Sequence, residues 1–362
     1  MNAIPSVPRF HQLRVRDVTR ETPDAVSVAF DIPTELKKDY QFAAGQYLTL
    51  RTVIEGEEIR RSYSICTAPG DHELRIAVKQ VENGVFSSWI NQQVQPGDVL
   101  EVMTPTGRFG LAHAPGDGRH HVAFAAGSGI TPVLSIARDV LAREPDSDFT
   151  LFYGNRATET ILFRGDLEDL KDRYLSRFSV FHVLSREQQD VAALNGYIDA
   201  EKVKKWLRDV VPAARIDHAF ICGPEAMLET VEATLREAGL GAEQIHTERF
   251  ISARGGKPQI KPTIDEKAPP AHIATLIVDG KQRDVPVAEG EAVLDAALRA
   301  GMDLPFACKG GMCSTCRAKV LEGEVEMALN YALEPWETEA GFVLTCQSHV
   351  KTPRVVVDYD QV

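Results

Sequence analysis

Four of the six cysteines in this chain are spaced so that they could hold an iron–sulfur cluster. Cys308, Cys313 and Cys316 fall within nine residues, and Cys346 follows after 29 more. This C-x4-C-x2-C…C spacing is the plant-type [2Fe–2S] pattern. A structural zinc site would show a second C-x2-C-like pair, and disulfide frameworks belong mainly to small secreted proteins. We therefore predict that these four residues are the ligands of a [2Fe–2S] cluster, with reduced structural thiols as the alternative.

The loop between the first three cysteines is built from small residues. Gly310 and Gly311 can adopt backbone conformations that other residues avoid. Ser314 and Thr315 leave room for amide N–H groups to approach the cluster sulfides, and such hydrogen bonds help to set the reduction potential. The composition of this loop therefore agrees with the cluster prediction.

The overall composition is that of a globular protein with an acidic balance. Hydrophobic residues make up 44% of the 362 residues, and 52 Asp and Glu outnumber 40 Lys and Arg. An acidic balance argues against a nucleic-acid partner. The sequence shows neither an export signal nor an apolar run of about 18 residues. We expect a soluble cytoplasmic protein of two to three domains, with no membrane partner and with thiols that stay reduced.

The elements that must position these residues fall into separate regions along the chain. Residues 251–272 hold four Pro, two Gly and no aromatic residue, which is typical of a linker and leaves the cysteines in a unit over 273–362. Residues 1–112 alternate apolar and polar side chains between turn signals, which predicts an antiparallel β-barrel or sandwich. Residues 113–250 alternate buried-strand runs with helical patterns, which predicts a doubly wound parallel α/β sheet.

One segment of the α/β region has the pattern of a phosphate-binding turn. Residues 124–135 read as a strand, a glycine-rich turn and the start of a helix. Gly127 and Gly129 let the backbone approach a ligand, and Thr131 and Pro132 suit the first helical turn. A helix N-terminus favours phosphate, although the full G-x-G-x-x-G fingerprint is absent. The segment therefore indicates a nucleotide site, with an ordinary βα turn as the alternative.

Another predicted strand of this region ends in Cys222, Gly223 and Pro224. Open α/β sheets bind ligands at the carboxyl ends of their strands, so this segment is a second candidate for the nucleotide site. A cysteine at such a position can also be a buried core residue, and this alternative stays open.

A third segment could recognise an additional phosphate. Ser185 and Arg186 follow a predicted strand, and Arg156 follows the strand before it. An arginine near the ribose accommodates the 2′-phosphate of NADP, whereas the alternative is a solvated surface loop. The sequence therefore favours NADPH over NADH.

Taken in order, these segments make the chain similar to the ferredoxin–NADP reductase superfamily. In that family an R-x-Y-S segment holds the flavin, and here it is Arg61, Ser62, Tyr63 and Ser64. The resemblance implies that Arg61 pairs with the flavin phosphates and that Tyr63 stacks on the isoalloxazine ring. It also implies that Ser64 forms a hydrogen bond near the flavin N5 atom.

The family's second flavin segment is a G-x-x-S at the start of a helix. Gly84 and Ser87 match it, with Ser88 adjacent, and a helix N-terminus there suits the pyrophosphate of FAD. The strand that contains Lys79 and Val81 matches the one that lies along the ribityl chain. The resemblance therefore implies FAD as the flavin.

The nicotinamide and iron–sulfur regions complete the resemblance. The family places the cysteine of the C-G-P segment, here Cys222, beside the nicotinamide C4 atom, and Glu248 and Phe250 resemble the E-x-F ending of oxygenase reductases. The resemblance thus implies Ser64, Cys222 and Glu248 as catalytic residues. It also implies an α+β ferredoxin domain of the β-grasp type at the C-terminus.

The C-terminal stretch "LNYALEPWETEAGFVLTC" looks like one subfamily, the reductase components of bacterial phenylacetyl-CoA epoxygenase complexes. The resemblance implies electron transfer from NADPH through FAD and the [2Fe–2S] cluster to a di-iron oxygenase of phenylacetate catabolism. The alternatives are a reductase for a different oxygenase or desaturase and a redox-sensing binding protein.

Overall fold

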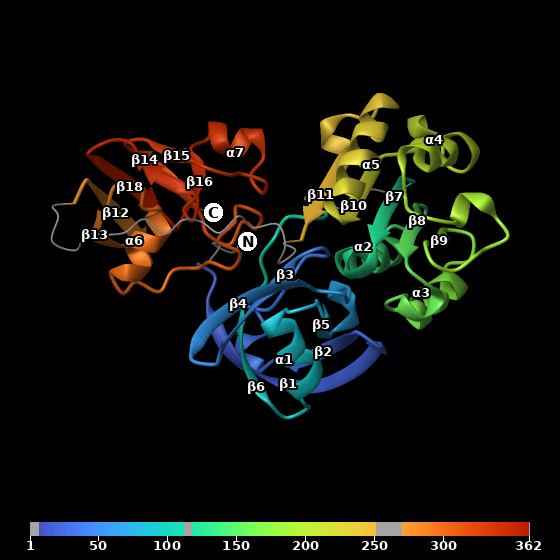
Figure 1. Ribbon diagram of the computed structural model, residues 1–362, viewed down its shortest axis with the longest axis horizontal. Coiled ribbons are helices and arrows are strands. Elements are labelled where there is room, and N and C mark those ends of the chain that lie inside the picture. The colour runs from blue at the N-terminus through green and yellow to red at the C-terminus, as the bar shows by residue number, and fades with distance from the viewer. Residues whose placement is uncertain (1–6, 112–117, 251–269, 362) are drawn as a thin grey trace. The chain divides into compact units, whose positions relative to one another are not determined.

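The computed structural model describes residues 7–111, 118–250 and 270–361, which are grouped into two compact units (Figure 1). One unit is His11–Phe250, and the other contains Met1–Phe10 and Ile251–Val362. The expected boundary near residue 112 and most of the linker over 251–272 lie outside the described residues, so both stay predictions. At the end of that range a strand already begins at His272.

The first unit opens with six antiparallel strands, in the order β4-β3-β6-β1-β2-β5. They are β1 (Phe10–Thr22), β2 (Ala25–Asp31), β3 (Tyr47–Ile54), β4 (Glu57–Ser64), β5 (Leu74–Lys79) and β6 (Val99–Met103). An isolated bridge between Ile65 and Ile76 joins the two ends of this sheet. The strands therefore close into the barrel that the alternating pattern predicts, and helix α1 (Val85–Gln93) buries Phe86 and Ile90 in its core.

Local sequence explains how the first hairpin forms. Glu55 and Gly56 connect β3 to β4, and both have positive φ angles, of 53° and 83°. A two-residue turn with this geometry matches the twist of the paired strands, and glycine lowers its conformational cost. This hairpin brings Arg61, Tyr63 and Ser64 to the end of β4.

The second part of this unit is a five-stranded sheet in the order β11-β10-β7-β8-β9, in which neighbouring strands are parallel. The strands are β7 (His120–Ala126), β8 (Asp148–Asn155), β9 (Phe178–Leu184), β10 (His218–Gly223) and β11 (Ile245–Arg249). The chain order reverses between β7 and β10, and ligands of doubly wound sheets bind at such a switch point.

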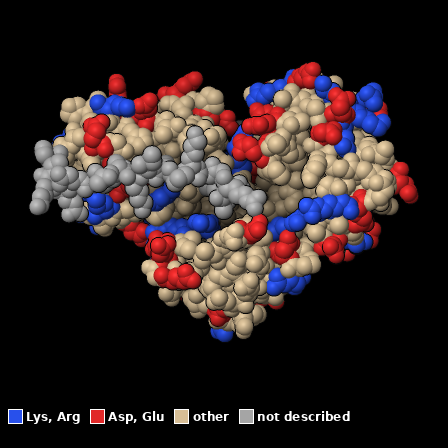
Figure 2. All heavy atoms as spheres, in the orientation of Figure 1, with Lys and Arg blue, Asp and Glu red and all other residues tan. Residues whose placement is uncertain are grey.

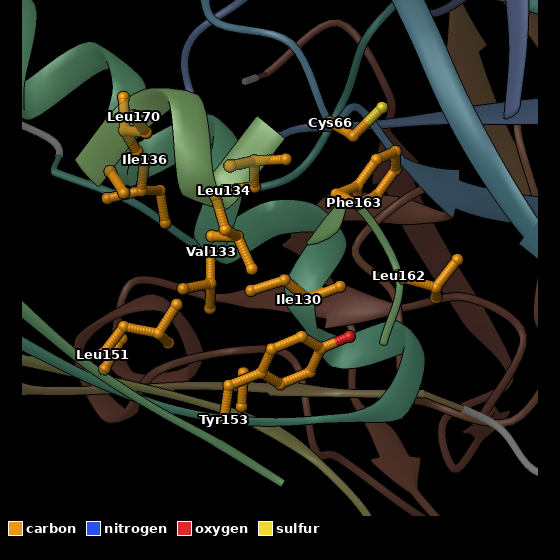
Figure 3. Packing of buried hydrophobic residues seen from close by; sticks show 14 of the residues in the cluster. Cys66, Ile130, Val133, Leu134, Ile136, Leu151, Tyr153, Leu162, Phe163 and Leu170 are labelled. Atoms are coloured by element: carbon orange, nitrogen blue, oxygen red, sulfur yellow. The ribbon is translucent and has the colours of Figure 1, made fainter. Parts of the chain in front are cut away.

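Helices cover both faces of the parallel sheet, as the alternating pattern predicts. Helices α2 (Ile130–Arg143) and α3 (Arg164–Arg173) form one buried cluster with the sheet, and α4 (Ala200–Asp209) and α5 (Glu225–Glu237) form another. Figure 3 shows Ile130 and Val133 of α2 lying near Leu151 and Tyr153 of β8. Because Cys66 of the barrel segment belongs to the same cluster, the barrel and the sheet share a core.

The second unit is a mixed sheet with two short helices, an α+β arrangement of the β-grasp type. Its sheet has the order β13-β12-β18-β14-β16, in which β12 and β18 are parallel. Its elements are β12 (His272–Val278), β13 (Lys281–Val287), α6 (Val293–Arg299), β14 (Arg317–Glu322), β15 (Val325–Met327), α7 (Pro335–Glu339), β16 (Phe342–Leu344), β17 (Ser348–Val350) and β18 (Arg354–Asp358). The four expected cluster ligands lie in the loops around this core.

Short 3-10 turns complete the described elements. One of them, Gly127–Gly129, lies in the expected phosphate-binding turn. The others are Thr34–Leu36, Pro69–Asp71, Thr158–Thr160, Ala192–Leu194, Ala213–Arg215 and Ala242–Gln244. Among the described residues, no helix combines the length and the apolar character needed to cross a membrane.

Candidate functional site

The predicted strand, glycine turn and helix lie at the switch point of the parallel sheet. β7 ends at Ala126, the turn spans Gly127–Gly129, and α2 begins at Ile130. Gly127 has a φ of +56°, and its carbonyl oxygen accepts a hydrogen bond from the Tyr153 hydroxyl at 2.9 Å. The first amides of a helical segment have no intrahelical acceptor, so they are available to a phosphate.

Gly129 brings this turn against the C-G-P segment. A Cβ atom at Gly129 would lie 2.1 Å from the carbonyl oxygen of Cys222, so only glycine allows this approach. Pro132 and Thr131 occupy the first turn of α2, and the Thr131 hydroxyl donates to the Ser128 carbonyl at 2.9 Å. The structure therefore places Gly127, Gly129, Gly223 and Pro224 at the adjacent ends of β7 and β10.

Cys222 and Glu248 are neighbours on β10 and β11. The Cys222 side chain is fully buried in the core, and burial raises the pKa of its thiol. Glu248 is partly buried, and desolvation raises the pKa of its carboxyl to about 8. Both groups are therefore neutral at pH 7, so Glu248 can donate a proton while Cys222 is no thiolate nucleophile. Phe250, at the end of this unit, is exposed.

The expected phosphate-recognition residues come together at the ends of β8 and β9. The Arg186 amide donates to the Arg156 carbonyl at 2.7 Å, which places the two arginines beside each other, next to Ser185. Arg186 is exposed, and Arg156 is half exposed. The backbone thus brings two arginines to the carboxyl ends of β8 and β9, and arginine is the side chain best suited to bind a ribose phosphate.

Asp24 is a residue that the sequence did not reveal. Its carboxylate lies 3.4 Å from the Lys79 ammonium and 3.4 Å from the Arg156 guanidinium. It therefore links the barrel strand that the resemblance assigns to the ribityl chain with the arginine at the end of β8. Nothing in the segment "ETPDA" marks it apart from an ordinary turn, because the contact spans 132 residues.

The R-x-Y-S segment occupies the last part of β4. Arg61 is exposed, and its guanidinium donates to the Arg60 carbonyl at 2.8 Å. Tyr63 is partly buried, with its ring 6.0 Å from that of Phe86, and burial raises the pKa of its phenol. Ser64 is buried. An exposed guanidinium and a neutral aromatic ring beside each other can bind a phosphate and an apolar ring system.

The G-x-x-S segment forms the N-terminus of α1, which has nine residues. A Cβ at Gly84 would lie 2.3 Å from a Val81 methyl group and 2.6 Å from the Ser87 hydroxyl, so any other residue here would displace these two side chains. The Ser87 hydroxyl donates to the Gly84 carbonyl at 3.1 Å, and the Ser88 hydroxyl accepts from Gln80 at 3.2 Å. These serines thus fix the turn. The first amides of a helix lack intrahelical acceptors, so the start of α1 can bind an anion such as a pyrophosphate.

The four thiols of the cluster motif converge in the second unit. Cys316 and Cys346 are buried, and Cys308 and Cys313 are partly exposed. Hydrogen bonding from the Cys313 thiol lowers the pKa of Cys308, whose sulfur also accepts the Gly310 amide at 3.3 Å. A thiolate that accepts an amide hydrogen bond is the donor that iron–sulfur clusters require.

The donor set consists of thiols alone. A [2Fe–2S] cluster is held by four such thiolates, spread over two irons. Within the described parts of the chain, no three His, Cys, Asp or Glu residues are arranged to hold one metal ion.

Two residues of the cluster loop have a left-handed backbone conformation. Gly311 has a φ of +73°, but the second left-handed residue is Lys309 (+51°), and Gly310 is not one. Gly310 instead serves through its amide, which donates to Cys308. A Cβ on Gly311 would lie 2.8 Å from the Leu329 carbonyl oxygen, so this glycine is needed for close packing as well.

Sequence reasoning also missed the residues that support the cluster loop from behind. The Thr345 hydroxyl donates to the Cys316 carbonyl at 3.0 Å and accepts from the buried Tyr359 hydroxyl at 2.8 Å. The Gln347 amide donates to the Lys309 carbonyl at 2.9 Å. No motif in the sequence around these three residues marks them, because only folding brings them next to the cluster loop.

Family models match three successive parts of the chain. An oxidoreductase FAD-binding domain matches residues 12–110, an oxidoreductase NAD-binding domain matches 124–233, and a 2Fe-2S iron-sulfur cluster binding domain matches 276–351. The expected flavin, nucleotide and iron–sulfur domains are thereby confirmed. Whether the nucleotide is NADPH or NADH stays a prediction.

Whole-chain relatives have the same organisation. The chain is 44% identical to a 1,2-phenylacetyl-CoA epoxidase component of Escherichia coli over 97% of its length and 98% of the relative. It is 31% identical to the ferredoxin reductase component of 3-ketosteroid-9-alpha-monooxygenase from Rhodococcus rhodochrous over 96% of each chain.

Among solved structures, phthalate dioxygenase reductase matches with a TM-score of 0.57 and 24% identity over 96% of this chain and 98% of that chain. An intact type IV self-sufficient cytochrome P450 monooxygenase matches with a TM-score of 0.68 and 22% identity over 97% of this chain and 41% of that chain. At these identities the two matches establish the three-domain fold.

Proposed function

The chain belongs to the family of FAD- and [2Fe–2S]-containing reductase components of multicomponent oxygenases, and we propose that it supplies electrons from NADPH to a di-iron oxygenase that epoxidises phenylacetyl-CoA. The observation that carries this proposal is the 44% identity to a phenylacetyl-CoA epoxidase component along almost the whole of both chains. Relatives named as reductase components of other oxygenases are less similar, with identities of 32% for one 3-ketosteroid-9-alpha-monooxygenase component and 29% for one glycine betaine monooxygenase component. Reduced cluster thiols also agree with a cytoplasmic site of action.

We assign the flavin to the end of β4 and the start of α1. Arg61 would hold the flavin phosphates together with the first amides of α1, which Gly84, Ser87 and Ser88 shape, and Tyr63 would cover the ring. Ser64, Lys79 and Val81 would complete the flavin site. When bound, FAD supplies the exchange between two-electron and one-electron chemistry that separates a nicotinamide from an iron–sulfur cluster.

We assign the nicotinamide nucleotide to the switch point between β7 and β10. The turn Gly127–Gly129 would bind its pyrophosphate, and Gly223 and Pro224 would line the nicotinamide side beside Cys222, Glu248 and Phe250. Arg156, Ser185 and Arg186 would bind a 2′-phosphate, which is why we propose NADPH rather than NADH. The protonated Glu248 carboxyl would hold its proton in this site at neutral pH.

We assign the [2Fe–2S] cluster to Cys308, Cys313, Cys316 and Cys346, in the domain that we place at 273–362. The flavin and nucleotide domains would span 1–112 and 113–250, joined to it by a linker over 251–272. The amide of Gly310 would donate to a ligand sulfur, and so would the Gln347 side chain, which lies 3.8 Å from the Cys346 sulfur. Such hydrogen bonds favour the reduced, more negative cluster.

A coupled assay tests this function. The purified protein is mixed with NADPH, oxygen, phenylacetyl-CoA and a purified phenylacetyl-CoA oxygenase component, and the oxygenated thioester is measured by mass spectrometry. Product that depends on this protein supports the proposal, with a lower rate when NADH replaces NADPH. Rapid NADPH-driven reduction of a one-electron dye without any thioester product would show a reductase that serves a different oxygenase or desaturase. Slow dye reduction would favour a redox sensor.

A further inference from the structure

The iron–sulfur unit exposes three large apolar side chains close together in the sequence. Leu329, Tyr331 and Trp336 are 44%, 51% and 57% exposed, and they lie within one stretch of eight residues. We call these three side chains the apolar ridge. Single exposed apolar residues are common on protein surfaces, whereas clustered ones mark interaction sites, and Tyr and Trp are enriched where proteins bind one another.

The apolar ridge is attached to the loop that holds the cluster. The Tyr331 amide donates to the Gly311 carbonyl at 3.0 Å, and the Leu329 carbonyl oxygen lies 2.8 Å from the position of a Cβ on Gly311. Gly311 lies between the ligands Cys308 and Cys313 in the sequence. A protein that covers the ridge therefore comes close to the cluster, as a one-electron acceptor must.

The segment that carries the ridge is held in one conformation. The Asn330 side chain accepts the Leu333 amide at 2.8 Å and donates to the Leu333 carbonyl at 3.0 Å, and Leu333 is buried in the core. At its other end, Glu337 forms a buried ion pair with Arg317 at 2.7 Å, next to Cys316. A preorganised surface loses less conformational entropy on binding than a flexible one.

Charge distinguishes between the proteins that could cover the ridge. Glu334 and Glu339 are exposed beside Trp336, and residues 273–362 contain 14 Asp and Glu against 8 Lys and Arg. The rest of the chain is no basic counterpart, since residues 11–250 contain 36 Asp and Glu against 27 Lys and Arg. Figure 2 shows acidic side chains along the edge of the second unit where Figure 1 places α7. These charges favour a basic partner over the flavin and nucleotide unit or a second copy of the chain.

We propose that the apolar ridge is the docking surface for the oxygenase component, whose facing surface is basic around an apolar centre. The inference rests on the proposed function and adds the surface through which the two proteins meet. Tyr331 and Trp336 are the expected anchors, because aromatic residues at the centre of an interface contribute most of its binding energy.

The test uses full-length Tyr331→Ser/Trp336→Ser protein, with Leu321→Ser as the control. Leu321 is exposed to a similar extent (46%) but lies on β14, outside the ridge. For each variant we measure the KM for the oxygenase component in the coupled assay and the rate of NADPH-driven bleaching of the cluster absorbance. We expect the KM of the double variant to rise about tenfold or more and that of the control to stay within about twofold. The bleaching rate should stay at the wild-type value in both variants.

Two results would contradict the docking surface while leaving the proposed function intact. An unchanged KM in the double variant, with product still formed, shows that the oxygenase binds elsewhere. A bleaching rate that falls in the double variant while the KM rises shows that the ridge faces the chain's own flavin unit. If the wild-type protein yields no oxygenated thioester, the proposed function fails and the docking surface fails with it.

Discussion

Replacing Gly129 by alanine should disable the nucleotide site by displacing its backbone. The added Cβ would lie 2.1 Å from the Cys222 carbonyl oxygen and 2.5 Å from its carbonyl carbon. Neither atom can move aside easily, because Cys222 belongs to β10, which pairs on both sides with β7 and β11. Ordinary van der Waals contact would require the turn and the strand to separate by about 1 Å or more.

This displacement has consequences for stability and for catalysis. Overpacking of this kind costs about 1–3 kcal/mol of folding free energy. Misplacing a bound reactant by about 1 Å can lower a rate about 100-fold. We therefore expect kcat/KM for NADPH, measured by dye reduction, to fall between about 10-fold and 100-fold, together with a lower thermal midpoint.

Two other glycines provide controls for this prediction. Gly165, in α3, would meet nothing within 4 Å, so Gly165→Ala should leave kcat/KM unchanged and stabilise the helix slightly. Gly127 also has open space but a φ of +56°, so Gly127→Ala should show the cost of backbone strain alone, about 1–2 kcal/mol. A Gly129→Ala protein with wild-type kcat/KM and thermal midpoint would refute the close approach of α2 to β10.

Three further predictions concern a buried ion pair, a histidine and the nucleotide specificity. Glu337→Ala should destabilise the iron–sulfur unit by about 3–5 kcal/mol, measured by urea-induced loss of cluster absorbance, because it removes the carboxylate that pairs with the buried Arg317 guanidinium. Arg317→Met/Glu337→Leu should cost much less, and equal losses of stability in the two variants would contradict this reasoning. Burial lowers the pKa of His246 from its ordinary 6.5 to about 4, so the neutral ring is the folded form. The free energy of unfolding should therefore be highest above pH 6.5 and fall by up to about 3 kcal/mol toward pH 4, because the unfolded chain takes up a proton there. The measurement is the urea midpoint as a function of pH. A His246→Gln protein whose midpoint falls as much as that of the wild type would exclude this cause. Arg186→Ala should raise the KM for NADPH about tenfold or more while leaving that for NADH unchanged, and equal changes for the two nucleotides would refute a role in 2′-phosphate recognition.

Local patterns in the sequence were sufficient to predict the domains. The cysteine spacing is a local signal, since three of the four ligands lie within nine residues, and it predicted the iron–sulfur domain that the family model confirms. The alternation of strands and helices likewise predicted the parallel sheet, because each element has its own hydrophobic period.

Contacts between distant segments could not be predicted in the same way. Asp24 meets Arg156 across 132 residues, and Gly129 meets Cys222 only because β7 and β10 are neighbours in the sheet. In the cluster loop, the two glycines marked a flexible backbone, but the structure gives the left-handed conformation to Lys309 and Gly311. Backbone geometry in such a loop depends on what packs against it, here Leu329. The conformational preferences of single residues cannot predict such packing.

The measurement that tests the central claim most directly is the coupled assay carried out with a Cys316→Ser protein. The account predicts that this protein binds FAD and reduces a two-electron dye with NADPH at close to the wild-type rate. It also predicts that the protein lacks cluster absorbance and forms no oxygenated thioester with the oxygenase component. Thioester formation at the wild-type rate by a protein without the cluster would contradict the account, because electrons would then reach the oxygenase by another route.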